Sequence, residues 1–203
     1  AWDEDRPGAG LVPGEGTARE AQARFVTPVP GGALALEVCS DDVIRVRYAK
    51  EPSFFDRSTL ATAPRRCSHP PFTLNAEDPT VKTITTAKLA VRLDVATGAL
   101  TFLDRAGQPI LVERRRELSP VTVQGEATHH VLQEWEPNAD EALYGLGQHQ
   151  QGLLDIKDVD LELRQYNTEI FIPFLVSSRG YGILWDNTSL ARFGDRTPAV
   201  PLP

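Results

Sequence analysis

Regular alternation of apolar and polar residues is the feature that most limits how this chain can fold. Apolar side chains recur at every second position over 34–38, a Ser-Asp-Asp turn follows at 40–42, and the alternation resumes over 44–48. Side chains of a β-strand point alternately to its two faces, so a period of two places the apolar residues on one side. The segment is therefore predicted to be a β-hairpin with one apolar face.

A second block of the same kind begins near Val81. Residues 89–95 alternate again, Thr97-Gly98 provides a turn, and a further turn leads into Ile110–Val112. Additional strands are expected at 121–123 and 131–135. Short strands separated by turns at this spacing are typical of sandwiches and barrels, and the 16 prolines and 15 glycines favour turns over long helices. The predicted fold class is all-β, an antiparallel β-sandwich.

The composition argues against several classes of protein. The 203 residues are 41% hydrophobic and 24% charged, which is ordinary for a globular protein and argues against disorder throughout. A formal net charge of −7 disfavours a nucleic-acid-binding protein, because such a protein needs a basic face. No apolar run approaches the roughly 18–20 residues of a membrane helix, so no membrane span is predicted.

Three parts are expected along the chain. Residues 1–24 are rich in Gly, Pro, Glu and Ala without a sustained period, and they are predicted to be irregular. Residues 25–197 are assigned to the β-sandwich. Residues 198–203 include three prolines, which favours an extended linker to a following domain that is not in this chain. The chain is therefore expected to be the front part of a longer protein.

The most informative stretch is 143–187. It opens with a Gly-x-Gly at 145–147, continues through a polar loop with three aspartates, and ends in strand-like segments at Ile170–Val176 and Tyr181–Trp185. The loop is too long for a simple hairpin, and long ordered loops in compact domains are often functional. Ile170–Val176 is apolar on both faces, which predicts a strand covered on both sides. Pro173 has no N–H for a strand ladder, so the strand is expected at a sheet edge or with a bulge.

Four pieces of this stretch match a known family in order and spacing. They are Leu-Tyr-Gly-Leu-Gly-Gln (143–148), Gln-Tyr-Asn-Thr-Glu-Ile (165–170), Ile-Pro-Phe (172–174) and Ser-Ser-Arg-Gly-Tyr-Gly-Ile-Leu-Trp-Asp-Asn (177–187). The chain resembles the N-terminal β-sandwich of glycoside hydrolase family 31, the α-glucosidases and α-xylosidases, and it looks most like bacterial α-xylosidases. The resemblance extends over roughly Ala33 to Asp195 and implies a galactose-mutarotase-like supersandwich.

The resemblance also implies where the chemistry lies. Enzymes of this family are retaining glycosidases whose nucleophile sits in a Trp-x-Asp-Met-Asn-Glu strand end of a (β/α)₈ barrel. This chain has no methionine and none of the repeated βα units of a barrel. No catalytic residue is therefore expected within it, and its implied role is to pack on the barrel and lend a loop to the substrate site.

The loop that maps to that role contains Gln165, Tyr166 and Asn167, which are the predicted substrate-binding residues. Amide groups both donate to and accept from sugar hydroxyls, and an aromatic ring can cover the apolar face of a pyranose. The alternative is that Tyr166 packs internally while the amides satisfy backbone groups. The implied partners are the missing barrel and an α-linked oligosaccharide, either xyloglucan-type or a gluco-oligosaccharide.

Two other functions stay open. One is a stand-alone, non-catalytic carbohydrate-binding module, and the other is an interaction scaffold without a ligand. No organic cofactor is expected. A sugar-degrading enzyme is usually exported, so a periplasmic or extracellular location is expected.

No metal site is predicted. His129 and His130 are adjacent, so in a strand they face opposite ways. The three aspartates 155, 158 and 160 lack the ligand spacing of a calcium-binding EF-hand loop. Cys39 and Cys67 are 67 − 39 = 28 residues apart and form no Cys-x-x-Cys pair, which disfavours a metal knuckle. They are either a disulfide, which their even number and an exported setting favour, or two unrelated thiols.

Overall fold

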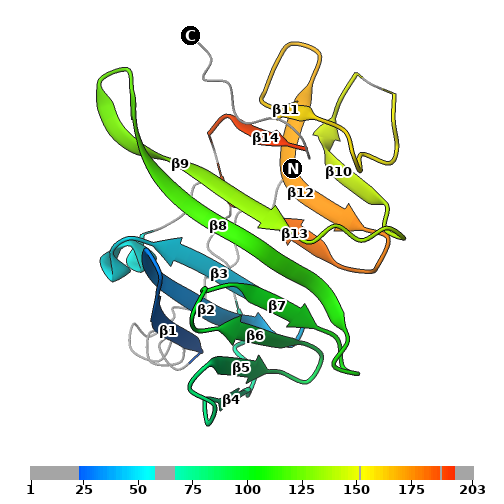
Figure 1. Ribbon diagram of the computed structural model, residues 1–203. Helices are drawn as coiled ribbons and strands as arrows, with labels where there is room; N and C mark the ends of the chain where they lie inside the picture. The colour runs from blue at the N-terminus through cyan, green and yellow to red at the C-terminus, as the bar shows by residue number, and fades with distance from the viewer. Residues whose placement is uncertain (1–22, 58–66, 151, 188, 195–203) are drawn as a thin grey trace, which may run out of the picture. The chain divides into compact units, whose positions relative to one another are not determined.

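The computed structural model describes residues 23–57, 67–150, 152–187 and 189–194 of the chain. Over these ranges the regular structure consists of β-strands and one short 3₁₀ helix, and all the strand pairs are antiparallel (Figure 1). The predicted all-β, antiparallel class is confirmed. Most of the predicted irregular segment 1–24 and the whole predicted linker 198–203 lie outside the described residues.

The described residues form two compact units. The first unit comprises 23–57 and 67–135, and the second unit comprises 136–150, 152–187 and 189–194. No helix in the described part of the chain is long and apolar enough to cross a membrane.

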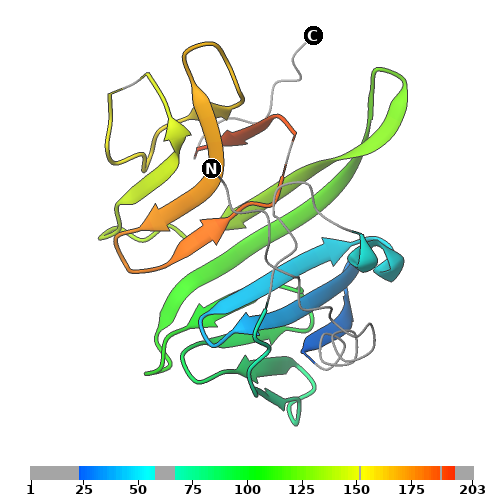
Figure 2. The same ribbon diagram turned by 180° about the vertical axis from the view of Figure 1, so that it is seen from behind.

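Two sheets make up the first unit, and their strands follow one another in chain order (Figures 1 and 2). One sheet contains β1 (Arg24–Val29), β2 (Gly32–Ser40) and β3 (Val43–Ala49), and the helix η1 (Pro52–Asp56) follows it. The other contains β4 (Thr73–Asn75), β5 (Val81–Thr85), β6 (Ala90–Asp94), β7 (Leu100–Leu103), β8 (Pro109–Val123) and β9 (Glu126–Trp135). Because each strand pairs with its neighbour in sequence, short turns suffice to connect most of the ladder.

The predicted hairpin is β2 and β3, in which Leu36 lies opposite Val46. Its apolar residues enter the main core of the first unit, where seven side chains from β2, β5, β6 and β7 are at most 1% exposed. They are Leu34, Leu36, Val38, Ile84, Val91, Leu93 and Leu100. The prediction of a single apolar face was incomplete. The opposite face of β2 carries alanines that pack with Phe55 of η1, so β2 is buried on both faces.

The strands predicted at 110–112 and 121–123 are one continuous strand. They are the two ends of the 15-residue β8, which pairs with β9 along a long hairpin. A run of charged residues, 113–117, lies between the two apolar ends. Because these residues are charged, the apolar–polar alternation that indicates a strand is interrupted there. The backbone nevertheless stays paired with β9 through this run.

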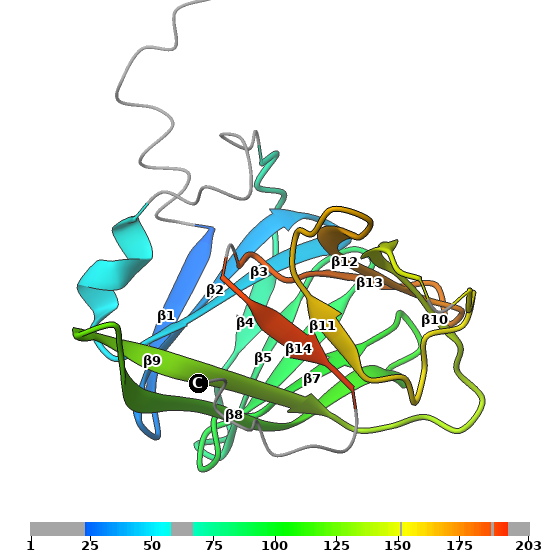
Figure 3. The same ribbon diagram turned by 90° about the horizontal axis from the view of Figure 1, so that it is seen from above.

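The second unit contains a three-stranded sheet and a separate two-stranded pair. The sheet has the order β10 (Leu143–Gln148), β12 (Ile170–Ser177), β13 (Gly182–Leu184). The pair is β11 (Leu161–Leu163) and β14 (Ala191–Phe193), which lie side by side in Figure 3. The core of the second unit consists of four buried residues, Leu146, Ile156, Leu161 and Leu163. Phe171, Leu175 and Phe193 pack against them.

Strand β12 confirms one expectation and corrects another. The register between β10 and β12 shifts between Gly145 and Gly147, so Pro173 lies at a bulge, one of its two predicted settings. The strand was also expected to be covered on both sides. In the structure Phe171 and Leu175 face the core, but Ile170, Ile172, Phe174 and Val176 are 39–54% exposed. The apolar composition of this second face is therefore not explained by burial within the described residues.

Candidate functional site

The candidate site is the connection from β11 to β12, residues 164–169. Its tip is closed by two backbone hydrogen bonds: the N–H of Tyr166 donates to the oxygen of Glu169 at 3.2 Å, and the N–H of Glu169 donates back at 3.3 Å. Asn167 and Thr168 form the turn between them. The end of the long polar stretch is thus a tight hairpin tip that holds its side chains at defined positions.

The three residues singled out in the sequence have different surroundings at this tip. Tyr166 is 62% exposed, and Asn167 is also exposed, so neither packs in the core. The side-chain oxygen of Gln165 accepts a hydrogen bond from the N–H of Phe171 at 2.9 Å. That bond fastens the tip to the beginning of β12. The alternative that the amides satisfy backbone groups therefore holds for the side-chain oxygen of Gln165. The side chains of Tyr166 and Asn167 are exposed to solvent.

Arg164 belongs to the same loop but was not among the predicted substrate-binding residues. Its guanidinium carbon lies 4.6 Å from the centre of the Tyr166 ring, a cation–π arrangement. Its Nε is 3.2 Å from a carboxylate oxygen of Glu162 on β11. Glu162, Arg164 and Tyr166 stand at alternate positions, so an extended backbone turns them to the same side. The Glu-x-Arg-x-Tyr spacing over 162–166 is the sequence signal that could have identified Arg164.

The strand beneath these residues is firmly anchored. Leu161 and Leu163 are 2% and 5% exposed, and both belong to the core of the second unit. Strand β11 also pairs with β14, where Leu161 lies opposite Phe193 and Glu162 lies opposite Arg192. The exposed polar face of β11 is therefore supported from behind by buried leucines, which limits its movement.

The two glycines of the Gly-x-Gly turn are explained by packing. Gly145 and Gly147 have φ angles of +100° and +107°, which disfavour other residues. A Cβ at Gly147 would lie 1.8 Å from the backbone oxygen of Ile170, and one at Gly145 would lie 2.5 Å from that of Phe174. These glycines let β10 approach the bulged part of β12.

Asp155, the first aspartate of the acidic loop before β11, has a structural role. The side chain of Asp155 accepts hydrogen bonds from the backbone N–H groups of Leu143 and Lys157, each at 3.0 Å. The bond from Leu143, followed by that from Lys157, holds the pKa of the Asp155 carboxyl below its usual value. Asp155 thus closes this loop onto the start of β10.

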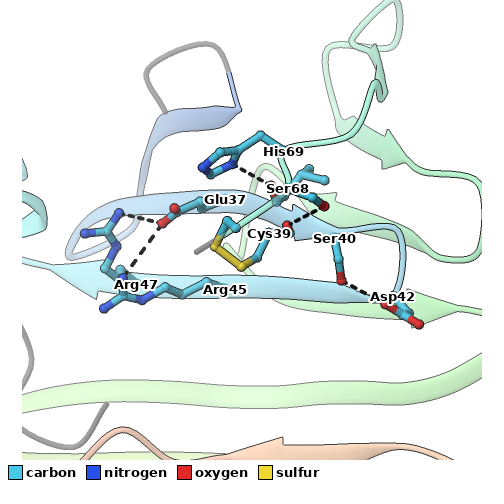
Figure 4. The surroundings of a disulfide bond; sticks show 10 residues. Glu37, Cys39, Ser40, Asp42, Arg45, Arg47, Ser68 and His69 are labelled. Atoms are coloured by element: carbon cyan, nitrogen blue, oxygen red, sulfur yellow. Dashed lines mark hydrogen bonds and ion pairs between the residues drawn. A yellow bond between two sulfur atoms is a disulfide. The ribbon is translucent and has the colours of Figure 1, made fainter. Parts of the chain in front are cut away.

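Among the described residues, one group of three potential metal ligands comes together, Glu37, Cys67 and His69, with ligand atoms within 4.8 Å of one another. Its chemistry does not suit a metal. Cys67 is bonded to Cys39, with Cα atoms 4.5 Å apart, and a disulfide sulfur lacks the charge of the thiolate that binds metals (Figure 4). The Glu37 carboxylate is held by Arg47 at 3.0 Å.

The Cys39–Cys67 disulfide is flanked by hydrogen bonds between the two segments that it joins. It joins the end of β2 to the segment that leads into β4. The N–H groups of Ser68 and His69 donate to the oxygen of Cys39 at 2.9 and 3.3 Å, and Nδ1 of His69 lies 3.1 Å from the oxygen of Val38 (Figure 4). Because a carbonyl only accepts, this nitrogen carries the proton. The covalent link and these bonds together fix the returning chain against β2.

Comparison with known families gives a match over most of the chain. Residues 33–193 match the family described as the glycosyl hydrolase 31 N-terminal galactose mutarotase-like domain. An α-xylosidase of Saccharolobus solfataricus is 33% identical over an alignment of 168 residues, and the match covers 77% of this chain and 22% of the relative. An uncharacterised family 31 glucosidase of Pseudescherichia vulneris is 28% identical over 183 residues, covering 77% of this chain and 33% of the relative. The chain thus spans between a fifth and a third of the length of these relatives.

Solved structures agree with the sequence match. The crystal structure of the family 31 α-xylosidase of Xanthomonas citri superposes with a TM-score of 0.78 at 33% identity, covering 85% of this chain and 19% of that chain. A family 31 α-xylosidase from a soil metagenome, complexed with xylose, gives a TM-score of 0.72 at 26% identity, covering 84% of this chain and 28% of that chain.

Proposed function

The chain belongs to the glycosyl hydrolase 31 N-terminal galactose mutarotase-like domain family, and from this premise we propose that it is the N-terminal part of a retaining α-glycosidase that acts as an α-xylosidase. Two of the relatives above are named α-xylosidases and share 33% of their aligned residues with it. A retaining mechanism needs two carboxyl groups about 5–5.5 Å apart. In this proposal the catalytic barrel that follows in the full protein supplies both.

The observation that carries the proposal is the continuity between the exposed loop tip and an exposed apolar strand face. Tyr166 and Asn167 stand immediately before β12, whose outer face presents a row of apolar side chains. The row is Ile170, Ile172, Phe174 and Val176, and Leu184 joins it from β13 opposite Phe174. Proteins rarely leave a contiguous apolar patch of this kind uncovered, so such patches mark interaction surfaces.

We assign this apolar face to the catalytic barrel of the same protein. The relatives are three to five times longer than the segment they share with this chain, which provides a large partner within one polypeptide. A barrel seated on the β12 face would bring its substrate site close to the 164–169 loop. The loop would then contact the leaving-group side of an α-linked oligosaccharide that contains xylose.

Within the loop, the proposed roles follow from chemistry and exposure. The Tyr166 ring offers an apolar surface to a pyranose, and the Asn167 amide offers both a donor and an acceptor to hydroxyls. Gln165 keeps its amide NH₂ for a hydroxyl while its oxygen is bonded to Phe171. These groups orient the substrate, and no organic cofactor takes part. The disulfide supports a periplasmic or extracellular location, because such bonds persist in oxidising compartments.

The test uses the full-length enzyme and the isolated chain side by side. The isolated chain should hydrolyse neither an aryl α-xyloside nor an aryl α-glucoside. In the full-length enzyme, Asn167→Ala should raise KM and change the preference among leaving groups by about 1–3 kcal/mol without lowering the thermal midpoint. Turnover by the purified chain, or an unchanged kcat/KM for every leaving group in the variant, would contradict the proposal.

The docking surface has its own test. Ile172→Asp should leave the isolated chain folded, because Ile172 is 54% exposed there, but it should destabilise the full-length enzyme. Val123→Asp, at a residue of β8 that is 53% exposed, is the matched control for an added negative charge. Hydrogen exchange of the β12 amides, already slowed by pairing with β10 and β13, should be slower still in the full-length enzyme. Equal exchange rates of β12 in the isolated chain and the full-length enzyme would show that the barrel does not cover it.

A second function, that of a sugar-binding module acting alone, is favoured by the exposure of Tyr166. Titration of the isolated chain with α-xylosyl oligosaccharides decides between the two. Binding that is as tight as in the full-length enzyme would support the module, whereas binding that requires the barrel supports the glycosidase.

A further inference from the structure

We propose that Arg164, held by Glu162, is a positioning residue that fixes the Tyr166 ring as a stacking platform for one pyranose of the substrate. This inference rests on the proposed function, because it explains how the same loop would bind its sugar. It concerns two charged residues that carry no sugar-binding signal of their own in the sequence.

The first step is the arrangement of the three side chains. The Arg164 guanidinium carbon lies 4.6 Å from the Tyr166 ring centre, while its Nε lies 3.2 Å from Glu162. The arginine therefore bridges a strand residue and the residue at the loop tip. A planar guanidinium can stack on a ring and approach a carboxylate at the same time, which a lysine ammonium cannot match in geometry.

The second step is the setting of Glu162. Its carboxylate oxygen Oε1 is buried and makes no hydrogen bond, although Arg164 Nε is within ion-pair distance of it. The contact is thus a charge interaction whose angle is not that of a hydrogen bond. An acceptor that is buried in this way attracts a donor strongly, since an unsatisfied buried oxygen is costly. Glu162 is part of β11, and this strand is anchored by its two buried leucines.

The third step is what the stack does to Tyr166. At 62% exposure an unsupported tyrosine would exchange between rotamers, and ordering it on binding would cost conformational entropy. With Arg164 against one ring face, the ring is already ordered and the other face remains open. A pyranose could then stack on the open face without that cost.

The experiment compares single and double variants in the full-length enzyme. Arg164→Ala and Tyr166→Ala should each raise KM for an α-xylosyl oligosaccharide about three- to tenfold and leave kcat nearly unchanged, the size expected of a partly exposed cation–π pair and a stacked ring. Arg164→Lys should restore only part of the loss. Glu162→Gln should show a smaller rise in KM. Arg57→Ala, which removes an arginine that lies 4.4 Å from the Phe54 ring in the first unit, is the matched control and should leave KM unchanged.

The double variant separates positioning from a merely structural role. If Arg164 acts through the ring, removing it in the Tyr166→Ala background should have no further effect on KM. The same loss in both backgrounds would overturn the inference. So would a rise in KM with Tyr166→Ala but none with Arg164→Ala, and in that case the proposed function would stand. If Tyr166→Ala and Asn167→Ala both leave KM unchanged, the proposed function itself is wrong.

Discussion

The two units of the molecule bury their apolar residues to very different extents. In the first unit, the main core contains seven side chains that are at most 1% exposed, drawn from both sheets. In the second unit, the core has four buried residues, while five large apolar side chains on β12 and β13 are between 38% and 54% exposed. The first unit also exposes large apolar side chains, but they are distributed over β1, β3, η1, β4, β8 and β9, whereas the second unit presents a row of them on one strand face.

One carboxylate in each unit shows a further difference. The first unit contains Glu113, whose side chain is fully buried. Arg116, Gln133 and the N–H of Leu100 all donate to its carboxylate, so the buried charge is satisfied. In the second unit, Arg164 and Glu162 are both partly exposed and meet beside the open Tyr166 ring. In the proposed function, the first unit is the scaffold and the second carries the interaction surfaces.

The largest expected difference between the units comes from truncating one apolar residue in each. Leu36→Ala removes a fully buried side chain and should lower the free energy of unfolding by about 2–5 kcal/mol. Ile172→Ala removes a 54% exposed one and should cost less than about 1 kcal/mol in the isolated chain. Urea denaturation of both variants measures this. Equal losses would show that the β12 face is already buried in the isolated chain.

Removing the disulfide should affect only the first unit. Replacing Cys39 and Cys67 together by Ala opens a link with a sequence separation of 28 and should cost about 2–4 kcal/mol. Hydrogen exchange resolves where the loss occurs. Protection should fall in β2 and β4, while β10 and β12 stay as they were. A uniform loss over both units would mean that they unfold as one and would contradict the division drawn here.

A glycine substitution tests how closely β10 is packed on β12 in the second unit. Gly147→Ala places a methyl group 1.8 Å from a backbone oxygen at a φ of +107°, and it should cost about 1–3 kcal/mol. Gly152→Ala is the matched control, because it has a positive φ of +67° but no atom within 4 Å. The control should cost about 1 kcal/mol or less, from the backbone alone. Thermal melts compare them, and equal losses would argue against the close approach.

The smallest effect expected is on alkaline stability, and it falls on the second unit. Burial, followed by the hydrogen bond that Tyr181 donates to Glu141 at 2.5 Å, raises the pKa of the Tyr181 phenol. Because the Tyr181 pKa is higher in the folded than in the unfolded protein, the neutral phenol contributes its full stabilisation below the unfolded-state pKa of about 10. This contribution to the free energy of unfolding is lost as the pH rises above that value. At about pH 11 the loss should be below about 1 kcal/mol, since the ring is partly exposed to screening solvent.

The control for this effect is Tyr181→Phe, which has no phenol to ionise. The variant should be less stable than the parent at neutral pH, but its stability should change less between about pH 9 and 11. Denaturant melts at a series of pH values measure both. The same alkaline loss in the variant and the parent would assign the effect to another group.

Much of the fold followed from local sequence patterns. Period-two alternation predicted the hairpin of β2 and β3, because a pleated strand turns every second side chain to one face. Pro173 predicted an edge or a bulge, because it has no N–H to donate. The motif pieces over 143–187 indicated the family, which the match over 33–193 then established. Each of these signals depends on residues that are close together in the chain.

The tertiary structure alone decided what depends on distant contacts. Nothing local shows that Glu113 is buried, since its partners Leu100 and Gln133 are 13 and 20 residues away. The second buried face of β2 depends on Phe55, and the continuity of β8 depends on its pairing with β9. The spacing of Arg164 and Tyr166 could suggest that they share a side, but only the folded structure places the Arg164 guanidinium over the ring. Local patterns determine which way a side chain points, whereas the group it meets depends on how the rest of the chain folds around it.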